Sequence, residues 1–321
     1  MNSIGAKIRG CTIIFAFVLF SGFAHALETD QFYAWGKPIE DSTHFLNAWV
    51  RLQIQDALDS RVNGKARDCE ATVNMVQKRL QHSIYQPIEL WINSTDLVDR
   101  VPHGVEEYRD YRQSYLLART YPLDTARGLQ PSPTLEVNGI RFGSDKLAHF
   151  FSEGWWYYKW WKKNQGNLSK EELQHELLLY GVSLEKWVHG ELLTGVISPA
   201  DMEANYQGFI FYQQLCNGKE PLLYQQGGVW HFSESFDIAN YVSPEWDESW
   251  NANIYSKVRW KHIRETMAAY CPMLKDEWVQ NQRARYAELD TRTPTESLLR
   301  ELINSGDLPD TLPFDIVSVC D

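Results

Sequence analysis

Hydrophobic and aromatic residues recur along most of this chain at helical spacing, which predicts a mainly α-helical protein. Outside residues 145–215, the pattern predicts helices over 42–61, 68–82, 105–119, 256–270, 275–290 and 294–305. Two stretches alternate instead, around Asn138-Gly139 and Gly227-Gly228, and each predicts a small β-hairpin. Residues 87–93 fit either a short strand or a buried turn. We therefore expect a helical bundle with one or two small hairpins.

A helix predicted over 145–163 is apolar or aromatic on nearly every side. At about 100° per residue, Asp145, His149 and Ser152 fall on one stripe, with Glu153 at its edge. A helix of this kind is usually buried, and an unpaired buried charge is costly. Asp145 and His149 should therefore find partners elsewhere in the chain.

Two further helices carry polar residues that can reach the same place. Capping-box signals open one helix over 172–190 and another over 199–215. Glu185 lies beside the apolar seam of the first, and Asp201 and Asn205 share a face of the second. Helices joined by short loops tend to be antiparallel neighbours, so we expect these side chains to converge.

Carboxylates and an imidazole in one place suit two kinds of chemistry. They bind divalent metal ions through nitrogen and oxygen, and they act as acids and bases when burial moves their pKa values. We assign His149 as acid, base or ligand, with Asp145 and Glu185 as ligands or orienting carboxylates. Asp201 and Asn205 complete this candidate site, and His149, Asp145 and Glu185 are the candidate ligands of a divalent metal.

Simpler roles are open for the same residues. Asp145 and Asp201 each lie where a carboxylate caps a helix N-terminus. Glu153 and Glu191 are expected to be solvated, while a buried Asn205 needs partners for its amide. The alternative to a functional site is a buried network that only fixes packing.

The N-terminus has the pattern of a secretory signal peptide. Lys7 and Arg9 are positive, residues 11–23 are apolar, and Ala-His-Ala follows as a cleavage site. We expect residues 1–26 to be removed and the mature chain to be secreted into the periplasm of a Gram-negative bacterium. No later stretch has the roughly 20 apolar residues of a spanning helix, so no transmembrane segment is expected after removal.

Charge and aromatic content limit the partners. The net charge is −11, and it becomes −13 once Lys7 and Arg9 are removed, which excludes nucleic acid. The chain has 13 Trp, 16 Tyr and 14 Phe, and exposed aromatics outside the cell often contact sugars or membrane surfaces. An envelope lipid or glycan is therefore the expected partner. Trp246 and Trp250, in a polar loop, are expected at a rim or lid.

Four cysteines remain after signal removal, an even number that predicts two disulfides in an oxidising compartment. Three pairings are possible. We expect Cys216–Cys271, which leaves Cys69–Cys320 to tie the two ends of the chain.

The polar residues also resemble a known pattern. The matching positions are Asp145-Lys146-x-x-His149, then Glu185, then Ser198-x-x-Asp201-x-x-x-Asn205-x-x-Gly208. This order is similar to that of the YfiM-like periplasmic proteins and of the VanZ-like family, over about residues 143–210. A departure is that Val188-His189 stands where such proteins commonly carry an Asp. The resemblance implies a polar site between helices in an envelope setting, and it implies no particular reaction.

Together these observations predict one domain with an N-terminal helical region over 27–120, a site-bearing region over 134–305 and an irregular tail over 306–321. We expect an exported envelope protein that hydrolyses a lipid-linked or glycan component. The alternative is a non-catalytic periplasmic binding or structural protein.

Overall fold

The computed structural model is mainly helical, with three small two-stranded antiparallel sheets among the residues that it describes. It describes residues 29–60, 68–82, 86–114, 131–187, 195–289 and 292–321. The expected signal peptide and Glu191 lie outside this part of the chain. Among the described residues, no helix combines the length and the apolar character needed to cross a membrane.

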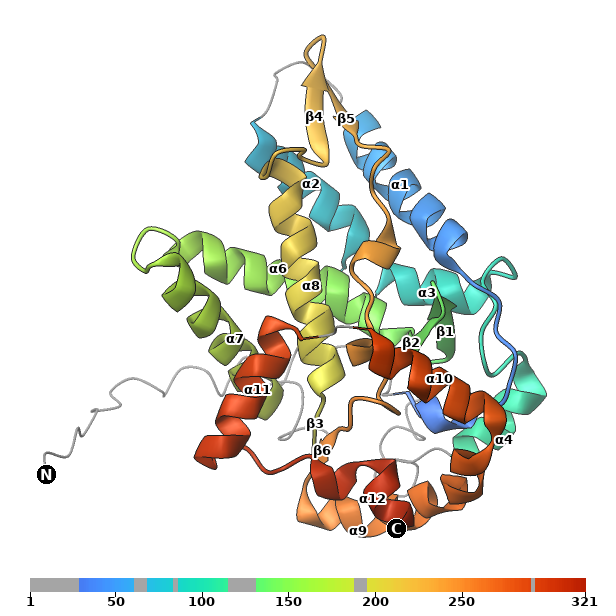
Figure 1. Ribbon diagram of the computed structural model, residues 1–321. Coiled ribbons are helices and arrows are strands. Elements are labelled where there is room, and N and C mark those ends of the chain that lie inside the picture. Colours follow the sequence, from blue (N-terminus) through green and yellow to red (C-terminus); the bar gives the residue numbers. More distant parts are fainter. Residues whose placement is uncertain (1–28, 61–67, 83–85, 115–130, 188–194, 290–291) are drawn as a thin grey trace, which may run out of the picture.

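Two long helices cross at the centre of the molecule, α6 (Asp145–Asn164) and α8 (Pro199–Cys216) (Figure 1). Glycines make their close approach possible. A Cβ atom added to Gly208 would lie 1.9 Å from the carbonyl oxygen of Phe150, and one added to Gly154 would lie 2.6 Å from Gly208 Cα. Because only hydrogen atoms fit between these backbones, the polar N-terminal halves of both helices lie close together.

The remaining helices surround this crossing. Earlier in the chain than α6 are α1 (Thr43–Asp59), α2 (Cys69–Leu80), α3 (Pro87–Ser94) and α4 (Val105–Ser114). Later in the chain follow α7 (Lys170–Trp187), α9 (Lys257–Met267), α10 (Glu277–Glu288), α11 (Pro294–Ser305) and α12 (Ile316–Cys320). Helices α1 and α2 form the expected helical hairpin, and α7 and α11 pack against α8 on another side (Figure 1).

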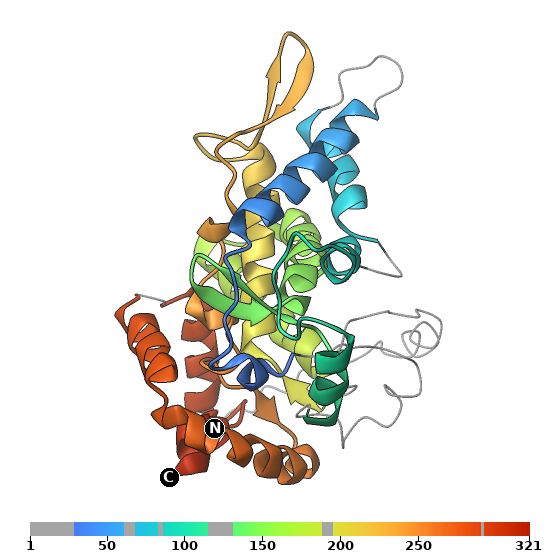
Figure 2. The same ribbon diagram turned by 90° about the vertical axis from the view of Figure 1, so that its right-hand side faces the viewer.

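The short strands connect distant segments and deliver the chain to the central helices. Strands β1 (Thr134–Val137) and β2 (Ile140–Gly143) form the first predicted hairpin, whose turn places Asn138 and Gly139 at φ 50° and 74°. Strands β4 (Leu223–Gln226) and β5 (Val229–Phe232) form the second, which projects from the body in both views (Figure 2). Strands β3 (Val196–Ile197) and β6 (Ile254–Tyr255) pair just before α8.

Three expectations need correction. Residues 87–94 form helix α3, because Pro87 suits the first helical position and Ile88 and Ile92 are buried one turn apart. The tail is not wholly irregular, since it contains the short 3-10 turn Leu312–Phe314 and helix α12.

The expected cysteine pairing is wrong. The disulfides are Cys69–Cys216 and Cys271–Cys320. The first joins the start of α2 to the end of α8, and the second joins the 3-10 segment Ala268–Lys275 to α12. Each bridge links two elements that pack together, a proximity that cysteine spacing does not reveal.

Candidate functional site

A fully buried lysine lies at the centre of the polar cluster. The Nζ atom of Lys146 is 2.6 Å from Asp145 Oδ2, 2.5 Å from Asp201 Oδ1 and 2.7 Å from Glu248 Oε1. The lysine side chain is 0% exposed, and its partners come from α6, from α8 and from the loop after the 3-10 turn Pro244–Trp246. Burying an ammonium group without compensation is costly, so these three carboxylates are what permits the lysine to lie there.

His149 lies one turn further along α6 and faces α8. Its Nδ1 atom is 3.1 Å from Asn205 Oδ1, and its Nε2 atom is 3.4 Å from Asp201 Oδ2. Glu153 Oε2 lies 3.8 Å from the same Nδ1. The histidine side chain is 15% exposed, whereas those of Asp201 and Glu153 are 3% and 6% exposed. The imidazole is therefore the member of this group that is most open to solvent.

Asp201 uses its two carboxylate oxygens in two directions. Oδ1 faces Lys146 and Oδ2 faces His149, while its backbone N–H donates to the hydroxyl of Ser198 at 3.1 Å. The capping bond is therefore made by the main chain of Asp201 to Ser198, and the carboxylate side chain lies within the cluster.

Asp145 is held from its other side by the N-terminal segment. The hydroxyl of Thr29 donates to Asp145 Oδ1 at 2.8 Å. Gly143 makes this contact possible, because a Cβ atom at that position would lie 1.9 Å from the Thr29 hydroxyl oxygen. The hairpin β1–β2 ends at Gly143 and thus sets Asp145 in place at the start of α6.

Glu185 reaches the cluster from α7. One of its carboxylate oxygens, one nitrogen of His149 and one oxygen of Asp201 all lie within 4.8 Å of one another. Glu185 is 2% exposed. Within the described part of the chain, no donor forms a hydrogen bond or ion pair with its carboxylate. A buried carboxylate that lacks a donor and faces an imidazole and a second carboxylate is arranged as a metal ligand is.

Burial raises the pKa values of several carboxyl groups in and around the cluster. It raises the pKa of Glu185 to about 8, and the negative charge of Asp201 adds to this effect. It likewise raises the pKa of Glu89, on α3, to about 8 and that of Glu248 to about 7. Without a bound cation, these groups hold protons close to neutral pH.

The imidazole and the carboxylate of Asp201 shift as an opposite pair. Burial alone would lower the pKa of His149, yet the surrounding carboxylates, Asp201 foremost, raise it to about 9. Burial opposes ionisation of Asp201, but the charges of His149 and Lys146 hold its pKa below the ordinary value. Asp201 is thus an anion between two cationic groups in the chain as it stands.

All five residues predicted as the site lie in this one cluster. Asp145 and Asp201 share Lys146, His149 contacts Asp201 and Asn205, and Glu185 lies near both His149 and Asp201. The predicted set of metal ligands needs one correction, because Asp201 and not Asp145 lies with His149 and Glu185, while Asp145 lies with Asp201 and Glu248 around Lys146. The crossing of α6 and α8 brings Asp201 to His149.

Sequence reasoning missed other members of the cluster. Glu153 was expected to be solvated, but it is 4% exposed because α8 and α7 cover that edge of α6. Lys146 and Glu248 were given no role. The signal for Lys146 was present, since a lysine within an otherwise aromatic helix needs anionic partners. Trp246, expected at a rim or lid, is fully buried against Phe142.

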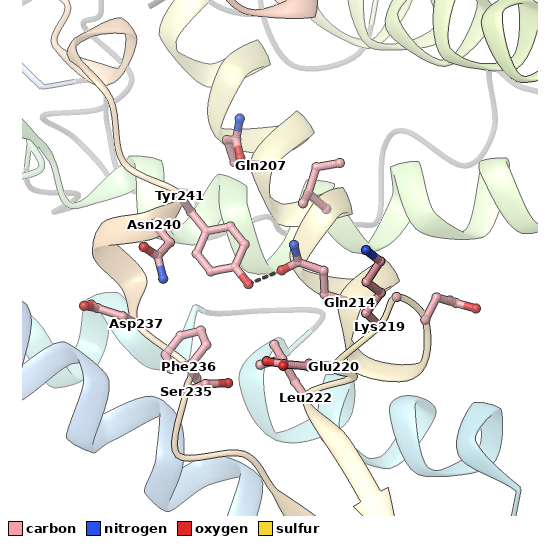
Figure 3. A pocket seen from close by; sticks show the side chains of 13 residues that line it. Gln207, Gln214, Lys219, Glu220, Leu222, Ser235, Phe236, Asp237, Asn240 and Tyr241 are labelled. Atoms are coloured by element: carbon pink, nitrogen blue, oxygen red, sulfur yellow. Dashed lines mark hydrogen bonds between the residues drawn. The ribbon is translucent and has the colours of Figure 1, made fainter.

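A separate cavity of about 380 Å³ lies along the second half of α8 (Figure 3). Residues from α8, from 217–222 and from 235–241 line it, and the hydroxyl of Tyr241 donates to Gln214 Oε1 at 2.5 Å. The residues that line it include none of the polar cluster, which consists of Asp145, Lys146, His149, Glu153, Glu185, Asp201, Asn205 and Glu248.

Comparison of the chain with family models, with curated proteins and with solved structures finds no match. Any chemistry assigned to the cluster therefore depends on the geometry of its side chains.

Proposed function

We propose that this chain is an exported envelope protein in which His149, Glu185 and Asp201 bind one divalent metal ion and hydrolyse a lipid-linked or glycan substrate. The observation that carries the proposal is the carboxylate of Glu185. It is buried, it lacks a donor among the described residues, and it faces the imidazole and the Asp201 carboxylate. A divalent cation at that point would satisfy all three groups together.

The donor set fits such an ion. One imidazole nitrogen and two carboxylate oxygens match the ligands that catalytic zinc and related divalent ions take from proteins. A bound ion of this kind supplies Lewis-acid polarisation and a water of lowered pKa.

Neighbouring side chains hold the imidazole in place for this task. Asn205 Oδ1 accepts a hydrogen bond from His149 Nδ1 when that nitrogen carries the proton, which leaves Nε2 directed at Asp201. Such an outer partner fixes both the tautomer and the orientation of a ligating histidine. Glu153, 3.8 Å from the same Nδ1, adds negative charge behind the ring.

The envelope setting is supported by three features. The N-terminal sequence has the signal-peptide pattern, the four other cysteines form two disulfides, and the residues resemble those of YfiM-like and VanZ-like envelope proteins. A lipid-linked or glycan substrate follows from that setting and from the aromatic content of the chain. Hydrolysis follows from the ligand set.

A second candidate function is a purely structural network. It is favoured by the complete burial of Lys146 and by the low exposure of its three carboxylate partners. On this alternative the cluster binds no ion, and its carboxyl groups remain protonated or paired with the lysine.

Glu185→Gln separates the two functions, because it removes the negative charge and keeps the size of the side chain. The matched control is Glu176→Gln on the exposed face of α7. The mature chain, supplied with Zn²⁺ or Mn²⁺, is incubated with a labelled lipid-linked oligosaccharide and, separately, with a labelled polymeric envelope glycan. The release of soluble label is measured.

We expect metal-dependent release from one of these substrates by the parent and by Glu176→Gln, and at least a hundredfold loss in Glu185→Gln. In the absence of metal, Glu176→Gln should unfold at the parent's temperature, and Glu185→Gln at the same or a higher temperature, because it removes a carboxyl group whose pKa is raised by burial. Release that is equal in Glu185→Gln and the parent, or no release from either substrate, would contradict the proposed hydrolysis.

A further inference from the structure

The cluster contains two places arranged for a cation, joined by one carboxylate. The first is the group of His149, Glu185 and Asp201 described above. In the second, one oxygen each of Asp145, Asp201 and Glu248 lie within 4.8 Å of one another. The two oxygens of Asp201 are divided between the groups, Oδ2 facing His149 and Oδ1 facing Lys146. Carboxylates in this bridging position join the two ions of two-metal centres.

The ammonium group of Lys146 fills the second place. An ammonium group has three donors and no acceptor. It donates hydrogen bonds to Asp145 Oδ2 and Glu248 Oε1 and forms an ion pair with Asp201 Oδ1 at 2.5 Å, so it contacts all three carboxylates. The lysine therefore supplies one positive charge where a second ion would otherwise balance the carboxylates.

Two of the three carboxylates, those of Asp145 and Glu248, are also held by groups other than the lysine. Thr29 donates to Asp145 Oδ1 at 2.8 Å, and the Ser198 hydroxyl donates to Glu248 Oε1 at 3.1 Å. The backbone N–H of Glu248 donates in turn to Gln31 Oε1 at 2.8 Å. The oxygen triad is thus fixed in part by its own outer partners, as metal-ligating carboxylates are.

We propose that Lys146 is a built-in cation that replaces the second ion of a two-ion centre, so that this protein binds a single divalent ion beside a fixed ammonium group. The single ion rests on the proposed function, whereas the role of the lysine does not. It follows that removing the lysine side chain opens a second divalent-cation site.

Two substitutions at this position make the inference testable. Lys146→Ala removes the charge and leaves space among three anionic oxygens, which is what a divalent ion requires. Lys146→Met removes the charge but fills the space with an apolar side chain of similar length. The matched control is Lys159→Ala, an exposed lysine of α6 whose ammonium group lies over the ring of Trp156.

Each mature protein is equilibrated with Mn²⁺, and bound manganese per chain is measured after removal of free ion. We expect one ion in the parent and in Lys159→Ala, two in Lys146→Ala, and no more than one in Lys146→Met. Equal manganese in Lys146→Ala and the parent overturns the inference. Zero ions in the parent and one in Lys146→Ala would refute the proposed function while supporting the role of the lysine.

A folding measurement covers the case in which Lys146→Ala is unstable without metal. Circular dichroism of this variant is followed as Mn²⁺ is added. Recovery of the helical spectrum with Mn²⁺, absent in Lys146→Met, supports a new ion site. A Lys146→Ala chain that remains unfolded at saturating Mn²⁺ overturns the inference, because the vacated triad then fails to hold the ion.

Discussion

Replacing Gly208 with alanine tests whether the crossing of α6 and α8 builds the site. The added Cβ atom would lie 1.9 Å from the carbonyl oxygen of Phe150. Ordinary contacts of this kind begin at about 3.4 Å, so the two backbones must separate by more than 1 Å. The clashing atom belongs to the main chain of α6, and no side chain can move aside to relieve it.

Overpacking in a well-packed core costs about 1–3 kcal/mol, and we place Gly208→Ala near the upper end because a whole helix must shift. The shift also moves Asp201 and Asn205 away from His149. Metal ligands tolerate displacements of only a few tenths of an ångström from their binding distances, so the affinity for a divalent ion should fall at least tenfold.

The assay is urea denaturation followed by circular dichroism, together with a metal titration of the folded variant. The control is Gly166→Ala in the turn after α6, where an added Cβ atom meets nothing within 4 Å. We expect this control to match the parent in both measurements. A Gly208→Ala protein as stable as the parent, with unchanged metal affinity, would refute the helix-crossing argument.

Two further predictions concern the metal-free protein. Because the pKa values of Glu89 and Glu185 are raised to about 8 and that of His149 to about 9, the folded chain binds more protons than the unfolded chain at neutral pH. The free energy of unfolding should therefore fall as pH rises from 6.5 towards 9, by about 1 kcal/mol per pH unit for each group until the pH passes the folded-state pKa of that group. Urea denaturation that finds the free energy of unfolding constant or rising would contradict these pKa shifts. Removing the disulfide Cys69–Cys216 with a double alanine substitution should cost about 3–5 kcal/mol, because it closes a loop of 147 residues; an unchanged melting temperature would show that packing alone holds α2 to α8.

Local signals in the sequence predicted the elements that carry the site. The stripe of Asp145 and His149 on an aromatic helix, the capping signal of Ser198 before α8, and the Asn138-Gly139 turn depend on residues within a few positions of one another. Each is observed. Because these local signals correctly predict the helices that carry the polar residues, the candidate site residues could be named from the sequence.

Long-range proximity was beyond such signals. Glu248 lies 102 positions after Lys146 and reaches it only because its loop folds back over the start of α6. The disulfide Cys69–Cys216 depends likewise on the packing of α2 against α8. Lys146 was missed for a different reason. Its position next to Asp145 lies about 100° away on the helix, yet its long side chain returns to the same carboxylates.

The most direct test of the account is a calorimetric titration of the mature chain with Zn²⁺ or Mn²⁺, in parallel with His149→Ala. We predict one divalent ion per parent chain and at least a hundredfold weaker binding in His149→Ala. A parent chain that binds no ion would contradict the proposed metal site and leave a buried packing network.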